Sequence, residues 1–163
     1  SLPIALAAAT ILLIMTMRSF KYAIVTVIPI GLVVAWLYGI IQIAGFSLNF
    51  VTAMIGAISI GVGIDYSIHM TERFREEINK TGDKVEAIRR AADGTGGALL
   101  ASAASSIAGF TIMGFAPMPV ISSFGVLTAI MIGLALIASL VVLPSLLFIV
   151  TPDPFRENRS VQR

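Results

Sequence analysis

The sequence predicts an all-α integral membrane protein: a bundle of five transmembrane helices with an amphipathic connector on its cytoplasmic side. Of its 163 residues, 57% are hydrophobic and only 12% are charged, whereas soluble domains carry about 25% charged residues. Residues 22–64 and 94–152 contain no Asp, Glu, Lys, Arg or His. Both stretches are much longer than the roughly 20 residues with which a helix crosses a bilayer.

Turn and charge signals separate the first three spans. The predicted spans are residues 2–17, 22–43 and 50–70. The basic pair Arg18 and Lys21 ends the first span. An uncharged turn, AGFSLN, precedes the third span, and Ser47 or Asn49 in this turn could cap the third helix.

Residues 71–93 form the only extended polar stretch and are the predicted connector. Their apolar residues recur at helical spacing, which indicates one or two amphipathic helices. Gly82 suits a helix C-cap, and Asp83 and Glu86 have the spacing of a capping box. Because its six acidic and six basic residues balance, we interpret the stretch as a connector against the membrane surface rather than as a partner-binding site.

The last two spans are separated by a proline turn, APMP. They are predicted at residues 96–115, which are rich in Gly and Ser, and at residues 120–150, where Pro144 is expected to kink the helix. Residues 1–150 are then the transmembrane domain, and residues 151–163 are a cytoplasmic tail.

The distribution of basic residues predicts the orientation. With five spans, all eleven Lys and Arg residues fall on one side of the membrane. Cytoplasmic loops carry the excess of Lys and Arg, so we expect a multi-pass protein of the cell membrane with an extracytoplasmic N-terminus and a cytoplasmic C-terminus.

Composition and motifs disfavour several function classes. The net charge of +2 gives no support to nucleic-acid binding, and the absence of cysteine removes disulfide and thiol chemistry. No His-Glu metal motif and no GxSxG motif is present, so an intramembrane hydrolase has no catalytic residues to use. We expect no enzyme activity, no cofactor and no metal site.

Asp65 is the candidate functional residue, because it lies inside an apolar span. A charge at the centre of a membrane helix costs roughly 2.5–3.5 kcal/mol on insertion scales. Asp65 precedes Glu72 by about 10 Å along a helix, which places it in the cytoplasmic half of the bilayer. It must therefore be protonated or face a cation, and no Lys or Arg of this chain lies at that depth. Such an acid is what a proton-coupled transporter requires.

Two helical faces are predicted to surround this acid. Gly61, Asp65 and His69 share one face of the third span, and Gly61 would leave clearance beside the acid. The fourth span offers a matching stripe of small, partly hydroxylated residues: Ala98, Ser102, Ser105, Ser106 and Gly109. The stripe serves helix packing or hydrogen bonds to the acid, and His69 is either part of a proton path or an interfacial residue.

The stretch GVGIDYSIHMTERFREE resembles the fourth-helix motif of resistance–nodulation–division (RND) transporters and is similar to the MmpL-like branch of hydrophobe/amphiphile exporters. The order of spans matches as well. The five-helix unit also resembles the sterol-sensing domain of Patched-like proteins, whose GxxxD pattern GVGID fits.

The resemblance implies two pseudo-symmetric halves of six helices, each with a large extracytoplasmic porter domain. This chain would be helices two to six of one half. Asp65 would be the proton-relay acid and Tyr66 the residue that often follows it, with the partner of Asp65 in the other half. This chain departs from the drug pumps of the superfamily in having no second acid beside Asp65 and no membrane lysine.

The resulting function hypothesis is the membrane part of an exporter of hydrophobic or amphiphilic molecules, driven by the proton motive force. Its expected partners are membrane lipid, protons, substrate, the other half and the porter domains, with a homo-oligomer as a further possibility. The alternative hypothesis is a regulatory module that binds lipid or sterol without ion coupling.

Overall fold

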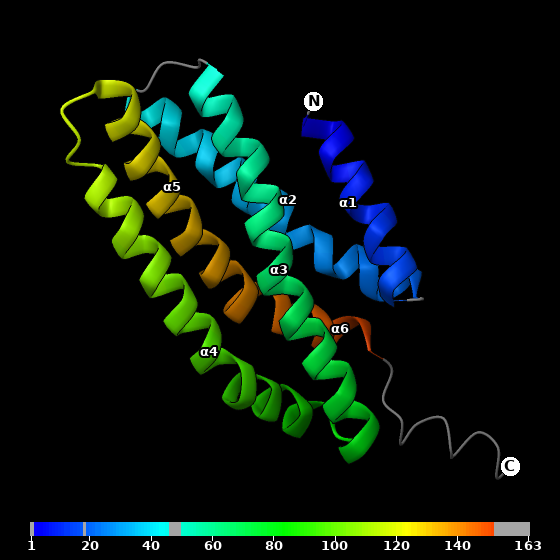
Figure 1. Cartoon of the computed structure of the whole chain (residues 1–163). Coiled ribbons are helices and arrows are strands. Elements are labelled where there is room, and N and C mark those ends of the chain that lie inside the picture. The colour runs from blue at the N-terminus through cyan, green and yellow to red at the C-terminus, as the bar shows by residue number, and fades with distance from the viewer. Residues whose placement is uncertain (1, 18, 46–49, 152–163) are drawn as a thin grey trace, which may run out of the picture.

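The structure, a computed structural model, describes residues 2–17, 19–45 and 50–151. Within these residues every element is a helix, and the predicted spans lie in these helices except for residues 114 and 115, which follow the end of α4. The elements are α1 (Leu2–Met17), α2 (Phe20–Ile43), α3 (Phe50–Thr81), α4 (Lys84–Met113), α5 (Pro119–Ile137), the π-helical segment η1 (Ala138–Val142) and α6 (Leu143–Val150). Figure 1 shows α2, α3, α4 and α5 side by side as a bundle.

Four helices of the described residues are long and apolar enough to cross a membrane. They are α2, α3, α4 and the continuous stretch of α5, η1 and α6, whereas α1 is a shorter apolar helix. The predicted capping residues Ser47 and Asn49, and residues 152–163 of the predicted tail, lie outside the described residues.

The residues of the predicted connector are helical on both sides of Gly82 and are continuous with the neighbouring spans. Helix α3 runs without a break from Phe50 to Thr81, and α4 runs from Lys84 to Met113. Residues 71–81 and 84–93 are therefore the polar ends of the two long helices and form a helical hairpin with them. The helical spacing continues through residue 70 because neither Gly nor Pro interrupts the chain there.

The hairpin turn at Gly82 and Asp83 follows from local sequence. Gly82 adopts a φ of 65°, a left-handed conformation that suits glycine after a helix end. The carboxylate of Asp83 accepts a hydrogen bond from the backbone N–H of Val85 at 2.9 Å, so Asp83 is the N-cap of α4. Glu86 does not complete the capping box, because it pairs with Arg89 and Arg90.

Ion pairs on the outside of the hairpin stabilise its two helices. Hydrogen bonds from Lys80 and then Arg73 hold the pKa of Glu76 below its usual value. Hydrogen bonds from Arg90 and then Arg89 lower the pKa of Glu86 in the same way. Since both carboxyl pKa values are depressed by folding, these contributions are present at neutral pH and are lost only as the pH falls through the depressed values.

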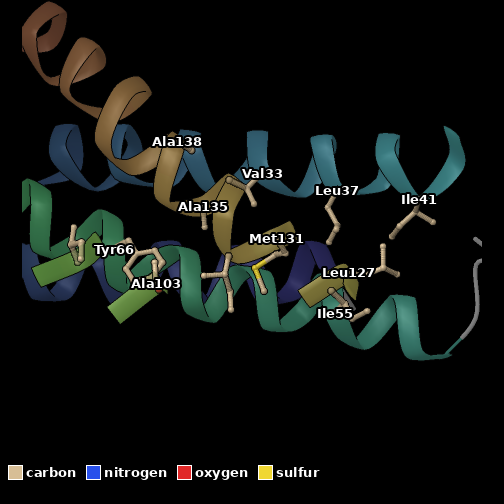
Figure 2. Packing of buried hydrophobic residues seen from close by; sticks show 12 residues of the cluster. Val33, Leu37, Ile41, Ile55, Tyr66, Ala103, Leu127, Met131, Ala135 and Ala138 are labelled. Carbon is tan, nitrogen blue, oxygen red and sulfur yellow. The ribbon is translucent and has the colours of Figure 1, made fainter. Parts of the chain in front are cut away.

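The main core lies between α2, α3, α4 and α5. Figure 2 shows its side chains pointing toward one another from the facing helices. The fully buried aliphatic members include Leu37 and Ile41 of α2, Ile55 of α3 and Leu127 and Met131 of α5.

A second core joins the hairpin to the rest of the bundle. Phe74 of α3 is completely buried there. The residues packed around it come from four helices: Val25, Met70, Ala87, Ala91, Leu143 and Leu147. The hairpin is thereby anchored on α2 and α6 rather than projecting freely.

The end of α1 is held by a residue of the hairpin. Arg75 of α3 donates a hydrogen bond to the carbonyl oxygen of Met17 at 2.9 Å. Its guanidinium carbon lies 5.1 Å from the centre of the Tyr22 ring. A cation at a helix C-terminus interacts favourably with the helix dipole, so Arg75 fastens α1 to α3.

Backbone contact between α4 and α5 depends on glycine. A Cβ atom on Gly125 would lie 2.6 Å from the carbonyl oxygen of Phe110 and 2.7 Å from the backbone nitrogen of Gly114. Only a residue without a side chain allows this separation. The end of α4 and the start of α5 therefore touch backbone to backbone.

The last span changes direction at η1, where the sequence predicts a kink at Pro144. Proline lacks the N–H that would bond to the carbonyl four residues earlier, and its ring clashes with that carbonyl. The helix becomes a wider π-helix just before Pro144, where the N–H of Leu143 donates a hydrogen bond to the carbonyl oxygen of Ala138, five residues earlier. Figure 1 shows α6 turning away from the line of α5.

Candidate functional site

Asp65 and His69 lie on one face of α3, a single helical turn apart. Both side chains are exposed in the described chain. The apolar residues on the opposite side of α3, such as Met70 and Phe74, are completely buried. The amphipathic division of α3 thus presents the carboxylate and the imidazole outward from the core.

A pocket of about 480 Å³ surrounds this face, between α3 and α4. We call it the Asp65 pocket. Its lining residues are Val62, Asp65, Tyr66 and His69 of α3, and Thr95, Ala98, Leu99, Ser102 and Ser106 of α4. The lining therefore combines one carboxylate, one imidazole, one tyrosine side chain and the hydroxyl groups of Thr95, Ser102 and Ser106.

Tyr66 connects the pocket with the core. It lines the pocket, yet only 6% of its surface is exposed, and it packs with Leu99 and Ala103 of α4. Figure 2 shows Tyr66 beside Ala103. The packing holds the Tyr66 ring between the two helices, whereas the neighbouring Asp65 is exposed.

Besides Ala98, which lines the pocket, the structure brings together five of the other eight residues that the sequence predicts for this site. Asp65, Tyr66, His69, Ser102 and Ser106 all line the pocket. Ser105, an exposed residue of α4, does not line it. Gly109 lines a different hollow, together with Ser106, Phe110 and Met113.

The two glycines before Asp65 have different surroundings. A Cβ atom on Gly61 would have no atom of the described chain within 4 Å, so the open space predicted beside this residue is present. Gly63 is buried and faces Ile30 of α2 and Ala135 of α5, at 3.7 and 4.0 Å from an added Cβ. A methyl group at this position would make only ordinary van der Waals contacts, so the packing around Gly63 does not require glycine.

Within the part of the chain that the structure describes, Asp65 and His69 form no hydrogen bond or ion pair. No group of three or more His, Asp or Glu side chains in the same residues is arranged to hold a metal ion. The chemistry that these residues can supply is proton uptake and release, by the carboxyl group and the imidazole, beside hydroxyl groups that can hydrogen-bond either form.

Sequence reasoning missed Thr95 as a pocket residue. It lies seven positions before Ser102, two helical turns away on the same face of α4, so extending the small-residue stripe by one repeat would have found it. The predicted connector ends at residue 93 and the predicted fourth span begins at residue 96, so Thr95 lies in neither.

The chain was compared with known proteins. The sequence model of the MMPL family matches residues 1–163. The chain is 33% identical over 139 residues to the membrane protein MJ1562 of Methanocaldococcus jannaschii, covering 85% of the chain and 36% of that protein. It is 31% identical over 151 residues to the hopanoid transporter HpnN of Rhodopseudomonas palustris, covering 90% of the chain and 17% of that protein.

A third relative is the apo-petrobactin exporter of Bacillus anthracis, 30% identical over 152 residues, with 86% of the chain and 20% of the exporter covered. The chain therefore spans about a third or less of the length of these relatives. Together with the four long apolar helices, the matches identify a multi-pass membrane protein.

Proposed function

Because the chain belongs to the MMPL family, within the RND superfamily, we propose that it is the transmembrane part of an exporter driven by the proton motive force. In this proposal Asp65 takes up the coupling proton from one side of the membrane and releases it to the other. Tyr66 and His69 belong to the same proton path. The names of relatives, a hopanoid transporter and an apo-petrobactin exporter, support export as the activity.

The observation that carries the proposal is the pocket in which Asp65 lies. A carboxylate on an apolar helix is costly in a membrane and marks a functional site by default. Here it lies in a pocket with His69 and with Thr95, Ser102 and Ser106. Protonation would remove its charge and with it the need for a polar partner, so the helices around the pocket would repack.

The exposed outer face of α4 supports a further part of the proposal, contact with the other half of the protein. Only 17% of the apolar stretch of α4 is buried, against 39–44% for the other three long spans. Ser102, Ser105 and Gly109 are all exposed on it. We propose that the other half covers this face and supplies the partner of Asp65, with the porter domains outside the membrane and the hairpin in the cytoplasm.

The substrate is proposed to be hydrophobic or amphiphilic. The small residues Ala98, Ser102, Ser105 and Gly109 suit close helix packing rather than recognition of a polar solute. We therefore assign selection of the substrate to parts of the protein outside this chain.

Replacing Asp65 by Asn in the protein that contains this chain tests the proposal. Asn has nearly the same shape but cannot exchange a proton, so we expect transport in vesicles to be abolished while the amount of protein in the membrane stays the same. Glu72→Gln is a matched control, because it makes the same change from acid to amide at an exposed residue of α3 that does not line the pocket.

Two further measurements separate proton coupling from lipid-dependent regulation. Collapse of the proton gradient should stop transport by the unaltered protein as completely as Asp65→Asn does. Undiminished transport by Asp65→Asn, or transport that ignores the gradient, would contradict the proposal and favour the regulatory module that binds lipid or sterol.

A further inference from the structure

The interface between α3 and α4 continues from the Asp65 pocket toward the hairpin turn. The two helices are antiparallel, so each later turn of α3 lies beside an earlier turn of α4, closer to the hairpin turn. Asp65 shares the pocket with Ser102, and His69 shares it with Thr95. One turn beyond His69, Arg73 faces Gly94. One further turn on, Glu77 faces Arg90.

Arg73 lies at this interface one helical turn beyond the pocket residue His69, and it contacts α4 at Gly94, next to the pocket residue Thr95. A Cβ atom placed on Gly94 would be 3.3 Å from Nε and 3.5 Å from Nη2 of Arg73. The guanidinium group therefore rests on the backbone of α4 next to Thr95, at the position that a side chain of residue 94 would otherwise occupy. Because Gly94 has no side chain, α4 provides a seat for this group.

Two carboxylates hold Arg73 in that position. Its Nη1 donates to Glu76 at 2.8 Å, and its Nη2 lies 3.1 Å from Glu77. The side chain of Glu77 is only 5% exposed, whereas that of Arg73 is 38% exposed. Glu77 thus forms a buried anchor, also approached by Lys80 at 3.7 Å and Arg90 at 4.0 Å.

We propose that Arg73 is the gate residue of the Asp65 pocket on its hairpin side. Held by Glu77 and seated on Gly94, the guanidinium restricts the passage of protons and other cations between the pocket and the aqueous phase at the hairpin. The restriction is both steric and electrostatic, since arginine keeps its charge at any physiological pH. Movement of Arg73 off Gly94 opens this route.

The gate rests on the proposed function, since it controls access to the acid that carries the coupling proton. Arg73 follows Asp65 by eight residues, about 12 Å along a helix. Removing a unit charge at about that distance changes a cation's energy enough for a roughly tenfold effect on its passage, at an effective dielectric constant near 20.

Proton leak in vesicles that contain the whole protein tests the gate. With an internal pH dye and no substrate present, Arg73→Gln should leak protons roughly tenfold faster than the unaltered protein, by the charge estimate above. Asp65→Asn combined with Arg73→Gln should return the leak to the unaltered level. Arg73→Lys keeps the charge and should leak much less than Arg73→Gln.

Arg89→Gln is the matched control. It removes the same charge from the same hairpin, but the side chain of Arg89 is 70% exposed and pairs with Glu86 of its own helix. An equal leak in Arg89→Gln and Arg73→Gln would overturn the gate, as would a leak that persists with Asp65→Asn.

The two proposals fail in distinguishable ways. If Asp65→Asn abolishes transport while Arg73→Gln leaks no more than Arg89→Gln, the proposed function stands and only the gate is overturned. If Asp65→Asn transports normally and no variant conducts protons, both proposals are overturned.

Access to the pocket gives a second readout that needs no transport. This chain contains no cysteine, so Ser102→Cys places a single thiol in the pocket within it. A small, membrane-impermeant cationic thiol reagent added from the hairpin side should label this thiol several-fold faster when Arg73 is replaced by Gln. Equal labelling rates with and without Arg73→Gln, in protein that remains folded, would contradict the gate.

Discussion

Substitution of Gly125 by Ala should destabilise the helix bundle strongly, and substitution by Val more so. The added Cβ would lie 2.6–2.8 Å from three backbone atoms at the end of α4, in Phe110, Met113 and Gly114. Backbone cannot rotate away as a flexible side chain can, so α4 and α5 must separate. Overpacking typically costs about 1–3 kcal/mol, and we expect the upper end of that range.

Thermal unfolding of the purified protein in detergent measures this effect. Gly133→Ala is the control on the same helix, because a Cβ there meets its nearest atom, Cδ1 of Ile107, at an ordinary 4.0 Å. We expect Gly133→Ala to leave the unfolding midpoint nearly unchanged and Gly125→Ala to lower it by several degrees. Equal midpoints would show that the two helices do not approach this closely.

Substitution of Phe74 by Ala should loosen the hairpin from the rest of the bundle. Phe74 is completely buried between α2, α4 and α6, and truncation of a buried Phe costs about 3–5 kcal/mol. Lys80 and Lys84, on either side of the turn, are exposed and partly exposed, respectively, but lie in helices, so trypsin can cleave after them only when the backbone around them unfolds, as loosening of the hairpin allows. We expect cleavage there to accelerate.

Phe115→Ala provides the comparison for this prediction. Phe115 is 85% exposed, and its truncation should leave both the proteolysis rate at the hairpin and the overall stability almost unaltered. Phe74→Leu keeps most of the buried volume and should fall between the two. Unchanged cleavage in Phe74→Ala would mean that this second core does not hold the hairpin.

Features encoded by a short stretch of sequence were predictable. Helical periodicity and the absence of charge predicted the helices themselves. The turn at Gly82 and Asp83 was predictable because a left-handed glycine and an N-cap aspartate act on their immediate neighbours. That Asp65 and His69 share one face of a helix followed from helix geometry alone.

Features that depend on how helices meet were not predictable. The sequence does not distinguish Gly125, whose missing side chain permits backbone contact, from Gly133, where a methyl group fits. The seat of Arg73 on Gly94 likewise depends on the register of the hairpin. That α3 continues to Thr81 could not be read from the end of the apolar span at residue 70, because a helix leaving the apolar phase changes its composition without changing its backbone.

The sequence predicts where the candidate site lies better than it predicts what the site does. That Asp65, Tyr66 and His69 share a pocket with Ser102 and Ser106 is a matter of packing between α3 and α4. Whether a proton moves there depends on the partner of Asp65, and the described residues contain no ionic partner for it.

The unbroken course of α3 has a mechanical consequence. Its 32 residues make a rod of about 48 Å, with Asp65 near its middle and the hairpin at its end. A rod without a hinge works as a lever: a small tilt at the acid displaces its tip by a larger distance. Rearrangement around the carboxylate would thus be amplified at the far end of α3, without a separate relay of side chains.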